Sequence, residues 1–404
     1  MARIFDHAGA ALYIVGGAVR NPLMGLPLSD IDVCGPALPD EVCALCEGTA
    51  VRAVMRERAF GSVELHIMDA SDQPQMAEYT TWRTDLYEGG HRPDRVAFTR
   101  DIALDARRRD FSVNALYQRV HEDALEPVID PTGGLDHLQS GVLHTVTEDP
   151  DEVLKNDGLR ILRAARFQAE LGLDPTPAHR ESLRRYAHLL GDIAPERMRE
   201  EFVKILMADL RYPMLKRSRP ASHSGLETLH HIGAWHTVMG PVAYDDPAAH
   251  ALARLESGSL CARLALLLHA ASLEDARSAL EHLRFPAREI TETLHILQAL
   301  SCADILAQAK LGPDALEAAR SLFHALGDEE SSSRIVHAME QLRGKPLSLK
   351  ELAVSGSDLK PLFLQQGRPM REMGAALENL WRAVLNGKAK NTKEALFQLF
   401  LADI

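Results

Sequence analysis

Apolar and polar residues follow two different patterns along the chain. In the first third, short runs rich in β-branched and aromatic residues alternate with polar positions, which predicts β-strands. The predicted strands are residues 11–15, 30–34, 62–68, 77–83 and 95–98. From about residue 150 onward, apolar residues recur at helical spacing, with Pro and Gly only between the segments. We therefore expect an α+β fold, in which a head with a small mixed β-sheet and helices precedes an all-helical remainder.

Turn-forming and linker-like segments indicate where the parts of the chain meet. Within the head, turns are expected at Gly16 and Gly17 and at "DPTGG" (130–134). The stretch "KRSRPASHSG" (216–225) has the composition of a linker. We expect a head at residues 1–145, a helical neck at 146–215, and a helical body and tail at 216–404.

Length and composition place the chain among ordinary globular proteins. It has 404 residues, of which 46% are hydrophobic, enough for two to four domains. No run approaches the roughly 18 uncharged apolar residues of a membrane span. Asp6 and His7 stand where the apolar region of a signal peptide would begin. We expect a cytoplasmic protein with no membrane partner.

The cysteines give little sign of a metal or redox site. Of the five, only Cys43 and Cys46 form a CxxC pair, on a predicted helix, and no second pair completes a zinc site. We interpret them as reduced thiols on one helix face.

The charge is acidic overall but uneven. A net charge of −12 argues against broad, non-specific coating of nucleic acid. Residues 155–220, however, hold 14 Lys and Arg against 9 Asp and Glu. This segment is either a local RNA track or a solvated helix face of mixed charge, and composition does not separate the two.

Two carboxylates provide the first candidate chemistry. Asp30 and Asp32 bracket Ile31, so on a strand both would point to one face. Like charges that close call for a cation, and oxygen ligands suit Mg²⁺ with positions left for substrate phosphates. Alone, this pair is as easily two exposed strand carboxylates.

The neighbouring sequence strengthens the metal hypothesis. "YIVGGAVRN" predicts a strand, a turn at Gly16 and Gly17, and a helix start with Arg20 nearby, a possible cradle for a triphosphate. Glu78, on a later strand, could add a third carboxylate. Such a cluster with Mg²⁺ would activate a hydroxyl and stabilise leaving pyrophosphate.

These motifs resemble a known family. "GGAVRNPLMGLPLSDIDV" is similar to the nucleotide- and metal-binding motif of the class II CCA-adding enzymes and the related bacterial poly(A) polymerases. "YEGGHRPD" resembles their flexible loop, "RRRDFSVNAL" their ribose-recognising motif, and "NDGLRILRAARF" with "ERMREEF" their neck helices. The resemblance covers about residues 12–205 in the expected order.

The resemblance implies roles for individual residues. Asp30, Asp32 and Glu78 would be catalytic, with the two aspartates as the metal ligands. The nucleotide would be bound by a larger set: Gly16, Gly17, Arg20, Arg108, Arg109, Asp110, Asn114, Asp157, Arg160 and Arg163. Asp110 and Asn114 would favour a ribonucleotide through its 2′-hydroxyl. The plainer alternative is a helix-capping Asp110 flanked by surface arginines.

Base selection is expected from Asp157 and Arg160. At i,i+3 on one helix they would leave the same face, a carboxylate accepting from an exocyclic amine and a guanidinium donating to a ring acceptor. That pair suits cytosine and adenine and mispairs with guanine and uracil. Arg163 would continue this face. The resemblance implies that Asp157 and Arg160 replace a nucleic-acid template. The alternative is an ordinary ion pair on the helix surface.

The sequence departs from the family pattern at two positions. Asn21 follows Arg20 where the family has Asp, and Asn156 precedes Asp157 where it has Glu. Both substitutions remove a charge but keep hydrogen-bonding capacity. We expect activity to survive, with some loss of rate or base fidelity.

We predict an Mg²⁺-dependent enzyme that adds CCA to the 3′ end of tRNA from CTP and ATP, with the helical body and tail holding the acceptor arm. Poly(A), CC-only and A-only products are alternatives, as is a non-catalytic RNA-binding protein built on this fold. A His-Asp phosphohydrolase is disfavoured because Ala270 follows His269. Lys388, Lys390 and Lys393 are candidate tRNA contacts or a solvated basic segment.

Overall fold

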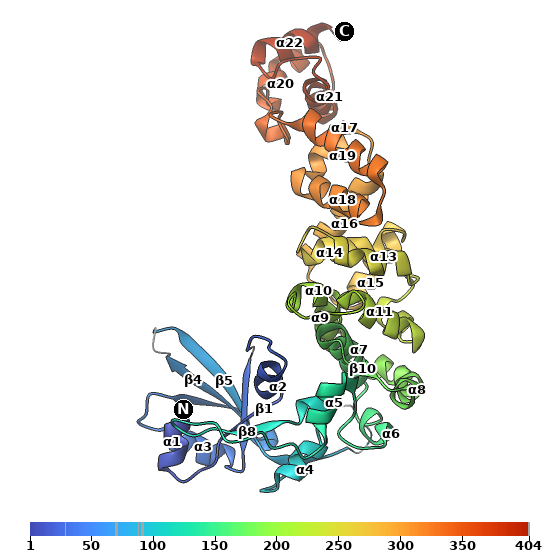
Figure 1. The fold of residues 1–404 in the computed structure, drawn as a ribbon. Helices are drawn as coiled ribbons and strands as arrows, with labels where there is room; N and C mark the ends of the chain where they lie inside the picture. The colour runs from blue at the N-terminus through green and yellow to red at the C-terminus, as the bar shows by residue number, and fades with distance from the viewer. Residues whose placement is uncertain (29, 69–71, 88, 90–92, 403–404) are drawn as a thin grey trace. The chain divides into compact units, whose positions relative to one another are not determined.

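The computed structural model of the protein describes residues 1–28, 30–68, 72–87, 89 and 93–402. The chain forms two compact units, Met1–Val238 and Met239–Ile404 (Figure 1). The first holds a mixed β-sheet with helices around it, and the second is helical in its described part. The predicted α+β fold is therefore confirmed.

A six-stranded sheet organises the head, in the order β3-β4-β5-β2-β1-β8. β2 and β5 run parallel, and every other neighbouring pair is antiparallel. β6 and β7 form a separate antiparallel pair. The strands of the head are β1 (Tyr13–Val15), β2 (Ile31–Gly35), β3 (Arg52–Glu57), β4 (Ser62–Met68), β5 (Pro74–Thr81), β6 (Arg83–Leu86), β7 (Arg95–Phe98) and β8 (Tyr117–Arg119).

Helices cover one face of this sheet and leave much of the other open. α1 (Ala2–His7) and α3 (Pro39–Cys46) contribute Phe5 and Val42 to a core with inward-facing strand residues such as Leu65 and Tyr79 (Figure 1). Successive strand residues face opposite ways. The alternate residues of β2, β4 and β5, among them Glu78, are consequently on the exposed face. The head also contains α2 (Gly17–Leu23), α4 (Ile102–Arg107) and α5 (Gly134–Ser140).

The sequence located most head strands but missed some. Each of the five predicted segments overlaps a strand, although the run 77–83 is divided at Trp82 between β5 and β6. β3 was missed because charged residues dominate this edge strand, whose outward side needs no apolar alternation. The expectation of an all-helical remainder after residue 150 is wrong at β10 (Asp174–Pro175), which pairs in parallel with β9 (Val142–Leu143).

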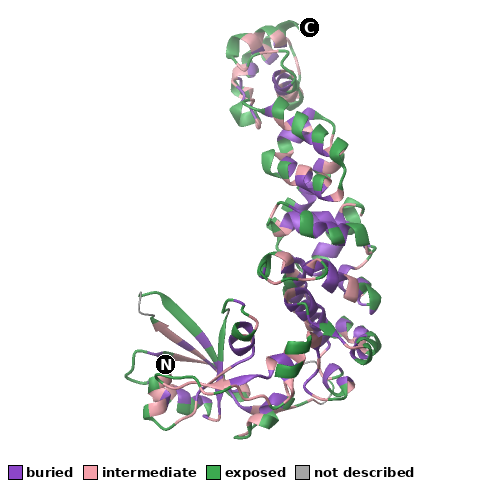
Figure 2. Ribbon diagram, in the orientation of Figure 1, coloured by how far each residue is buried: buried purple, intermediate pink, exposed green. Residues whose placement is uncertain are grey.

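Helix α7 (Leu159–Leu171) is the centre of the neck and is buried along most of its length (Figure 2). Gly225 of α11 lets that helix cross α7 closely, because a Cβ there would lie 2.8 Å from the Ala165 carbonyl oxygen. The linker expected at 216–225 is therefore wrong from residue 221 onward, where α11 begins. The other helices of this region are α6 (Pro150–Leu154), α8 (Pro177–Tyr186), α9 (Pro195–Leu206), α10 (Ala208–Arg211), α11 (Ala221–His231) and α12 (Trp235–Met239).

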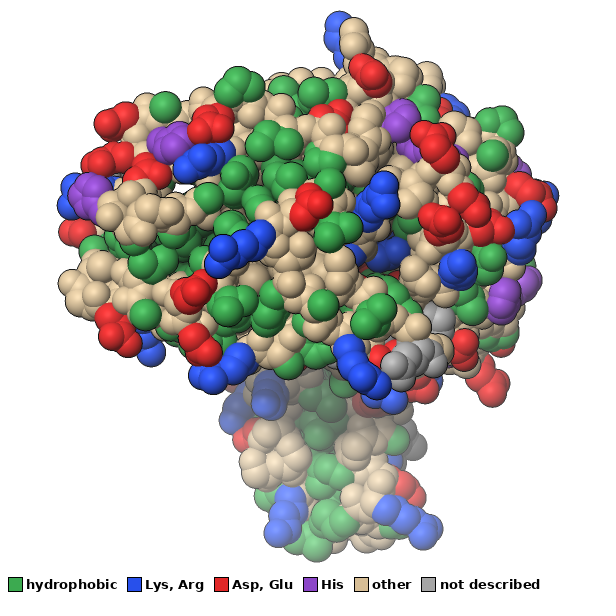
Figure 3. All heavy atoms as spheres, turned by 90° about the horizontal axis from the view of Figure 1, so that it is seen from below, with side chains coloured by type: hydrophobic (Ala, Val, Ile, Leu, Met, Phe, Trp, Pro, Cys, Tyr) green, Lys and Arg blue, Asp and Glu red, His purple; other side chains and the backbone are tan. Residues whose placement is uncertain are grey.

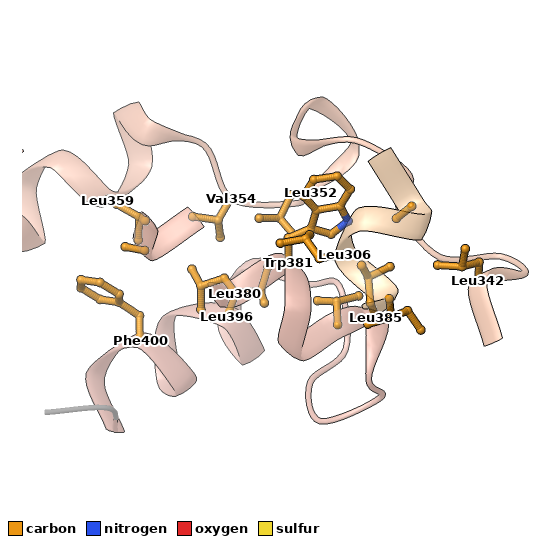
Figure 4. Packing of buried hydrophobic residues seen from close by; sticks show 14 of the residues in the cluster. Leu306, Leu342, Leu352, Val354, Leu359, Leu380, Trp381, Leu385, Leu396 and Phe400 are labelled. Carbon is orange, nitrogen blue, oxygen red and sulfur yellow. The ribbon is translucent and has the colours of Figure 1, made fainter. Parts of the chain in front are cut away.

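The second unit is built from short helices around apolar cores. Near its C-terminus, Trp381 lies among Leu306, Leu352 and Leu385, and its indole Nε1 donates to the Pro346 carbonyl at 2.7 Å (Figure 4). Within the described residues, no helix combines the length and apolar content of a membrane span. The helices are α13 (Asp246–Ala251), α14 (Leu260–Leu268), α15 (Leu273–His282), α16 (Ala287–Ser301), α17 (Ile305–Leu311), α18 (Pro313–Leu326), α19 (Glu329–Leu342), α20 (Gly356–Gln365), α21 (Met373–Leu385) and α22 (Lys393–Ala402).

Candidate active site

The exposed face of the sheet brings carboxylates together from neighbouring strands. Asp32 of β2 lies directly beside Glu78 of the parallel strand β5, and Glu78 faces Glu64 across β4. Ser62 donates its hydroxyl to Glu78 Oε1 at 2.8 Å, whereas Glu64 is paired with Arg56 at 2.6 Å. Asp30 stands one residue before β2 and is exposed. Asp32 and Glu78 thus meet as expected.

The environment of Asp32 disfavours its charge. Loss of solvent around the carboxylate, followed by repulsion from Glu78, raises the pKa of Asp32 above its ordinary value. Arg109 partly offsets this effect, while Asp30 adds to it. Crowded carboxylates with a raised pKa are a setting in which a bound cation lowers the electrostatic free energy.

Oxygen donors on this face suit a hard divalent ion, but they do not form a complete cage. Within the described part of the chain, no three His, Cys, Asp or Glu side chains are grouped closely enough to hold a metal. Mg²⁺ commonly takes one or two carboxylates and completes its shell with water and substrate phosphates. The donor set of Asp30 and Asp32, with Glu78 beside them, fits that mode.

A cavity of about 350 Å³ connects the carboxylates to basic side chains. Its lining includes the carboxylates of Asp32 and Glu78 and three arginines: Arg83, Arg108 and Arg109. Carboxylates that can hold a metal therefore share one space with guanidinium groups that can hold phosphate oxygens. This combination is the arrangement that phosphoryl and nucleotidyl transfer require.

Two of the three cavity arginines, Arg108 and Arg109, are held by Asp105, which sequence reasoning did not identify. Arg108 Nε donates to Asp105 Oδ1 at 2.7 Å, and Arg109 Nη2 donates to Oδ2 at 3.1 Å. Tyr117 donates its hydroxyl to the same Oδ2 at 2.7 Å. The i,i+3 and i,i+4 spacing of "DARRR" is the signal that could have located this contact.

Asp110 and Arg163 form a pair across 53 residues of sequence. Arg163 Nε donates to Asp110 Oδ2 at 2.6 Å, and Asn114 Nδ2 lies 3.5 Å from Oδ1. Burial opposes ionisation of Asp110, but Arg163 and Arg160 outweigh it and hold its pKa at about 2. The helix-capping alternative is therefore not what Asp110 does: its carboxylate joins the second motif to neck helix α7.

The first motif forms its turn, but Arg20 points inward. Gly16 has φ +65° and ψ −123°, a conformation that side chains disfavour, and Gly17 begins helix α2. The Arg20 side chain is only 6% exposed and donates to the side chains of Asn21 and Asn114. Its guanidinium also lies over the Phe167 ring. Arg20 is therefore engaged between head and neck in this structure, and its contact with a triphosphate stays a prediction.

Asn21 has a full set of hydrogen bonds. Its side-chain oxygen accepts from Arg20 Nη2 at 2.8 Å, and its amide nitrogen donates to the Pro27 carbonyl and the Tyr212 hydroxyl, each at 3.1 Å. A carboxylate could not donate to the Pro27 carbonyl. The departure from the family residue thus fits its buried surroundings.

Asp157 and Arg160 are close in sequence but do not share a helix. Asp157 precedes α7 and accepts from the Leu159 N–H at 3.0 Å and from Arg197 at 3.2 Å. Arg160, at 8% exposed, donates to the backbone carbonyls of Val153 and Arg108. The predicted single-helix geometry is wrong because the chain turns at 155–158 between α6 and α7.

A second, larger cavity lies beside this pair. Its volume is about 1010 Å³, and its lining includes Tyr87, Arg108, Asn156 and Arg160. Arg108 lines both cavities, so the space next to the carboxylates and the space next to Arg160 share a wall. The loop "YEGGHRPD" contributes Tyr87, whereas Glu88, Gly90, His91 and Arg92 lie outside the described residues.

The face drawn in Figure 3 shows no single broad basic field. On the face drawn in Figure 3, acidic and basic side chains lie next to one another among apolar ones. Three arginines of the locally basic segment, Arg160, Arg163 and Arg166, are engaged in hydrogen bonds and ion pairs with other residues of the first unit. In the tail, Lys393 is paired with Asp358 at 2.7 Å.

Comparison with known proteins identifies the family. Residues 12–144 match the poly(A) polymerase head domain, and 259–400 match the second domain of tRNA nucleotidyltransferases. The CCA-adding enzyme of Geobacillus stearothermophilus is 31% identical over 96% of this chain and 92% of its own length. That of Geobacillus thermodenitrificans is 32% identical over 98% and 94%. The chain belongs to the CCA-adding enzyme family of tRNA nucleotidyltransferases.

Solved structures agree with this membership. The CCA-adding enzyme of Bacillus stearothermophilus in complex with CTP has a TM-score of 0.78 and 26% identity, covering 99% of this chain and 95% of its own. The Thermotoga maritima CCA-adding enzyme complexed with tRNA-CCA, at 18% identity and a TM-score of 0.66, covers 100% and 93% and shares the fold. The family inferred from sequence motifs is confirmed.

Proposed function

We propose that the protein adds CCA to the 3′ end of tRNA, using CTP and ATP and releasing pyrophosphate. The observation that carries this proposal is the cavity shared by Asp32, Glu78, Arg108 and Arg109. Curated relatives that cover nearly the whole chain are CCA-adding enzymes, and one similar solved structure holds CTP. The same family membership makes the His-Asp phosphohydrolase alternative unnecessary.

Asp30 and Asp32 would hold Mg²⁺, with Glu78 beside Asp32 on the next strand. When bound, the ion would offset the carboxylate charges, polarise the α-phosphate and lower the pKa of the attacking 3′-hydroxyl. Ser62 keeps the Glu78 carboxylate in place through its 2.8 Å hydrogen bond. Glu64, the fourth carboxylate on this face, forms an ion pair with Arg56 and would therefore not be a metal ligand.

Arg108 and Arg109, which line the same cavity, would bind the triphosphate. Guanidinium groups match phosphate oxygens in geometry and keep their charge at all physiological pH values. Gly16 and Gly17 would contribute the close backbone approach of the turn. Asn114 would reach the ribose, whereas Asp110 would act through its ion pair with Arg163.

Asp157 and Arg160 would select the base. In the present structure Arg160 donates to two carbonyls, and Asp157 binds Arg197. A cytosine or adenine edge would take over part of these hydrogen bonds, with the carboxylate accepting and the guanidinium donating. Guanine and uracil would leave both groups unpaired, which disfavours them strongly.

The direct test incubates purified protein with Mg²⁺ and tRNA that lacks its CCA end. Each ribonucleoside triphosphate is added alone, and then CTP and ATP are added together. Growth by three nucleotides that then stops would establish CCA addition. Long A tails would make the protein a poly(A) polymerase, and CC or A alone would make it a partial enzyme. Absence of extension would favour the non-catalytic RNA-binding alternative.

A further inference from the structure

Asp105 has an unusual position for a carboxylate: it is fully buried, next to the proposed active site. It lies on α4, and its side chain is 0% exposed. Leaving such a group without partners would cost several kcal/mol. The local fold must therefore supply hydrogen-bond donors to the Asp105 carboxylate.

Four donors from three elements surround this carboxylate. Oδ1 accepts from Arg108 Nε at 2.7 Å and from the Arg83 backbone N–H at 3.2 Å. Oδ2 accepts from the Tyr117 hydroxyl at 2.7 Å and from Arg109 Nη2 at 3.1 Å. Each oxygen thus receives one guanidinium and one neutral donor, and the carboxylate hydrogen-bonding capacity is well used.

This single carboxylate holds both guanidinium groups, that of Arg108 through Oδ1 and that of Arg109 through Oδ2. Arg109 is constrained further, because its Nε donates to the Tyr117 hydroxyl at 2.8 Å and its guanidinium lies 5.1 Å from the centre of the Tyr117 ring. Arg108 and Arg109 both line the cavity that holds Asp32 and Glu78, whereas Asp105 does not line it. Asp105 therefore acts on the cavity only through the arginines.

Burial opposes ionisation of Asp105, yet Arg109 and Arg108 more than compensate, and the pKa of its carboxyl is lowered from the ordinary value. The group is charged throughout the physiological range. The negative charge of Asp105 thus holds the guanidinium groups of Arg108 and Arg109 in the cavity that also contains two carboxylates.

We propose that Asp105 is a positioning residue that sets Arg108 and Arg109 to bind the triphosphate of the incoming nucleotide. The inference rests on the proposed function, because it assigns the phosphate-binding arginines of that same site. The ligand chemistry is a nucleoside triphosphate or pyrophosphate, both of which carry the phosphate oxygens that paired guanidinium groups recognise.

The test is Asp105→Asn, which keeps the shape and removes the charge. An amide nitrogen in place of one oxygen would face an arginine donor and displace that guanidinium. We expect the KM for CTP and for ATP to rise roughly 10- to 100-fold, the range for losing one or two charge-assisted hydrogen bonds. Inhibition by pyrophosphate should weaken by a similar factor, whereas the KM for tRNA and the binding of cytidine, which has no phosphate, should stay within about twofold.

Asp101→Asn is the matched control. Asp101 is the exposed N-cap of the same helix and accepts from the Ala103 N–H at 2.8 Å. In the described part of the chain its side chain is hydrogen-bonded to neither Arg108 nor Arg109. Because asparagine caps a helix about as well as aspartate, the variant should leave both helix stability and pyrophosphate inhibition nearly unchanged. Tyr117→Phe removes one donor from Oδ2 and should fall between the two.

A structural role alone would give a different result. If Asp105→Asn only lowers the melting temperature, and its folded fraction keeps the wild-type KM for CTP and the wild-type inhibition by pyrophosphate, the positioning role is wrong. The wild-type extension assay separates the two levels. Failure of the wild type to extend tRNA counts against the proposed function, whereas an active wild type with an unchanged Asp105→Asn variant counts against this inference only.

Discussion

Both units of the molecule have apolar cores, but they differ in how many charged side chains they bury. Around the candidate active site in the first unit, charged side chains such as Asp105, Asp110, Arg160 and Glu201 are buried and joined in ion pairs and hydrogen bonds. In the described part of the second unit, Arg263 is the one Asp, Glu, Lys or Arg side chain that is buried. Its C-terminal core is apolar (Figure 4).

Buried charges and buried apolar side chains contribute differently to a folded protein. A buried ion pair contributes little net free energy of folding but fixes its partners in one arrangement, whereas apolar burial stabilises without directional demands. Changes of charge without change of size should therefore affect catalysis in the first unit. Changes of size should affect stability in the second unit, and the two kinds of substitution test this contrast.

The largest expected effect is that of Asp32→Asn on the rate of nucleotide addition. Loss of a metal-binding charge should lower kcat on the order of a thousandfold or more, with little change in the unfolding transition, because Asp32 is not part of the apolar core of the head. Single-turnover extension of tRNA with CTP measures the rate. Glu64→Gln is the control, since Glu64 lies on the same face but is paired with Arg56. Equal losses in both variants would contradict the assignment of Asp32.

In the second unit, Trp381→Ala should reduce the free energy of unfolding by about 3 to 5 kcal/mol. The side chain is 2% exposed, and its removal leaves a cavity and an unpaired Pro346 carbonyl. Urea denaturation followed by circular dichroism measures the change. Leu364→Ala, at a site 66% exposed, should change it by less than about 0.5 kcal/mol. A small effect at Trp381 would argue against an apolar core as the main source of stability.

The same contrast explains how far the sequence could be interpreted. Alternation along a strand is local, so the position of Asp32 on β2 and of Glu78 on another strand could be predicted from spacing. The inward orientation of Arg20 could not, because Asn21 meets Tyr212 across 191 residues of sequence. No local pattern encodes that contact.

Asp157 shows a second limit of local reasoning. Its i,i+3 spacing to Arg160 predicts a shared helix face only if one helix is continuous, and the turn before Gly158 breaks that condition. Gly158 is required there because a Cβ would lie 2.7 Å from the Leu189 carbonyl oxygen. The turn is therefore set by a tertiary contact with η3 (Ala187–Asp192).

A buried histidine in the first unit should make its stability depend on pH. His179 is 4% exposed, and its Nε2 accepts from the Thr145 N–H at 3.1 Å. Burial, with repulsion from His144 and His137, lowers the pKa of His179 to about 4. Between pH about 6.5 and 4 the unfolded chain binds a proton that the folded chain does not, so stability falls as pH falls, by up to about 3 kcal/mol.

His179→Gln isolates this contribution, because glutamine can still accept from Thr145 and does not titrate. Urea unfolding at pH 7, 5.5 and 4.5 should show a shallower loss of stability in the variant than in the wild type. The other histidines are common to both proteins and cancel in the difference. Parallel pH profiles would show that folding does not lower the pKa of His179.

The smallest expected effect concerns packing in the neck. Gly225→Ala would place a Cβ 2.8 Å from the Ala165 carbonyl oxygen and 2.9 Å from Ile205 Cγ2, so α11 must move away from α7 or α9. Overpacking of this kind costs about 1 to 3 kcal/mol, against a helix-propensity gain of about 1 kcal/mol. Thermal unfolding measures the net loss. Gly191→Ala is the matched control, since no atom lies within 4 Å of its added Cβ. If Gly225→Ala were as stable as Gly191→Ala, the close crossing of α7 and α11 would not require glycine. The crossing would then tolerate a larger side chain as readily as an exposed site does.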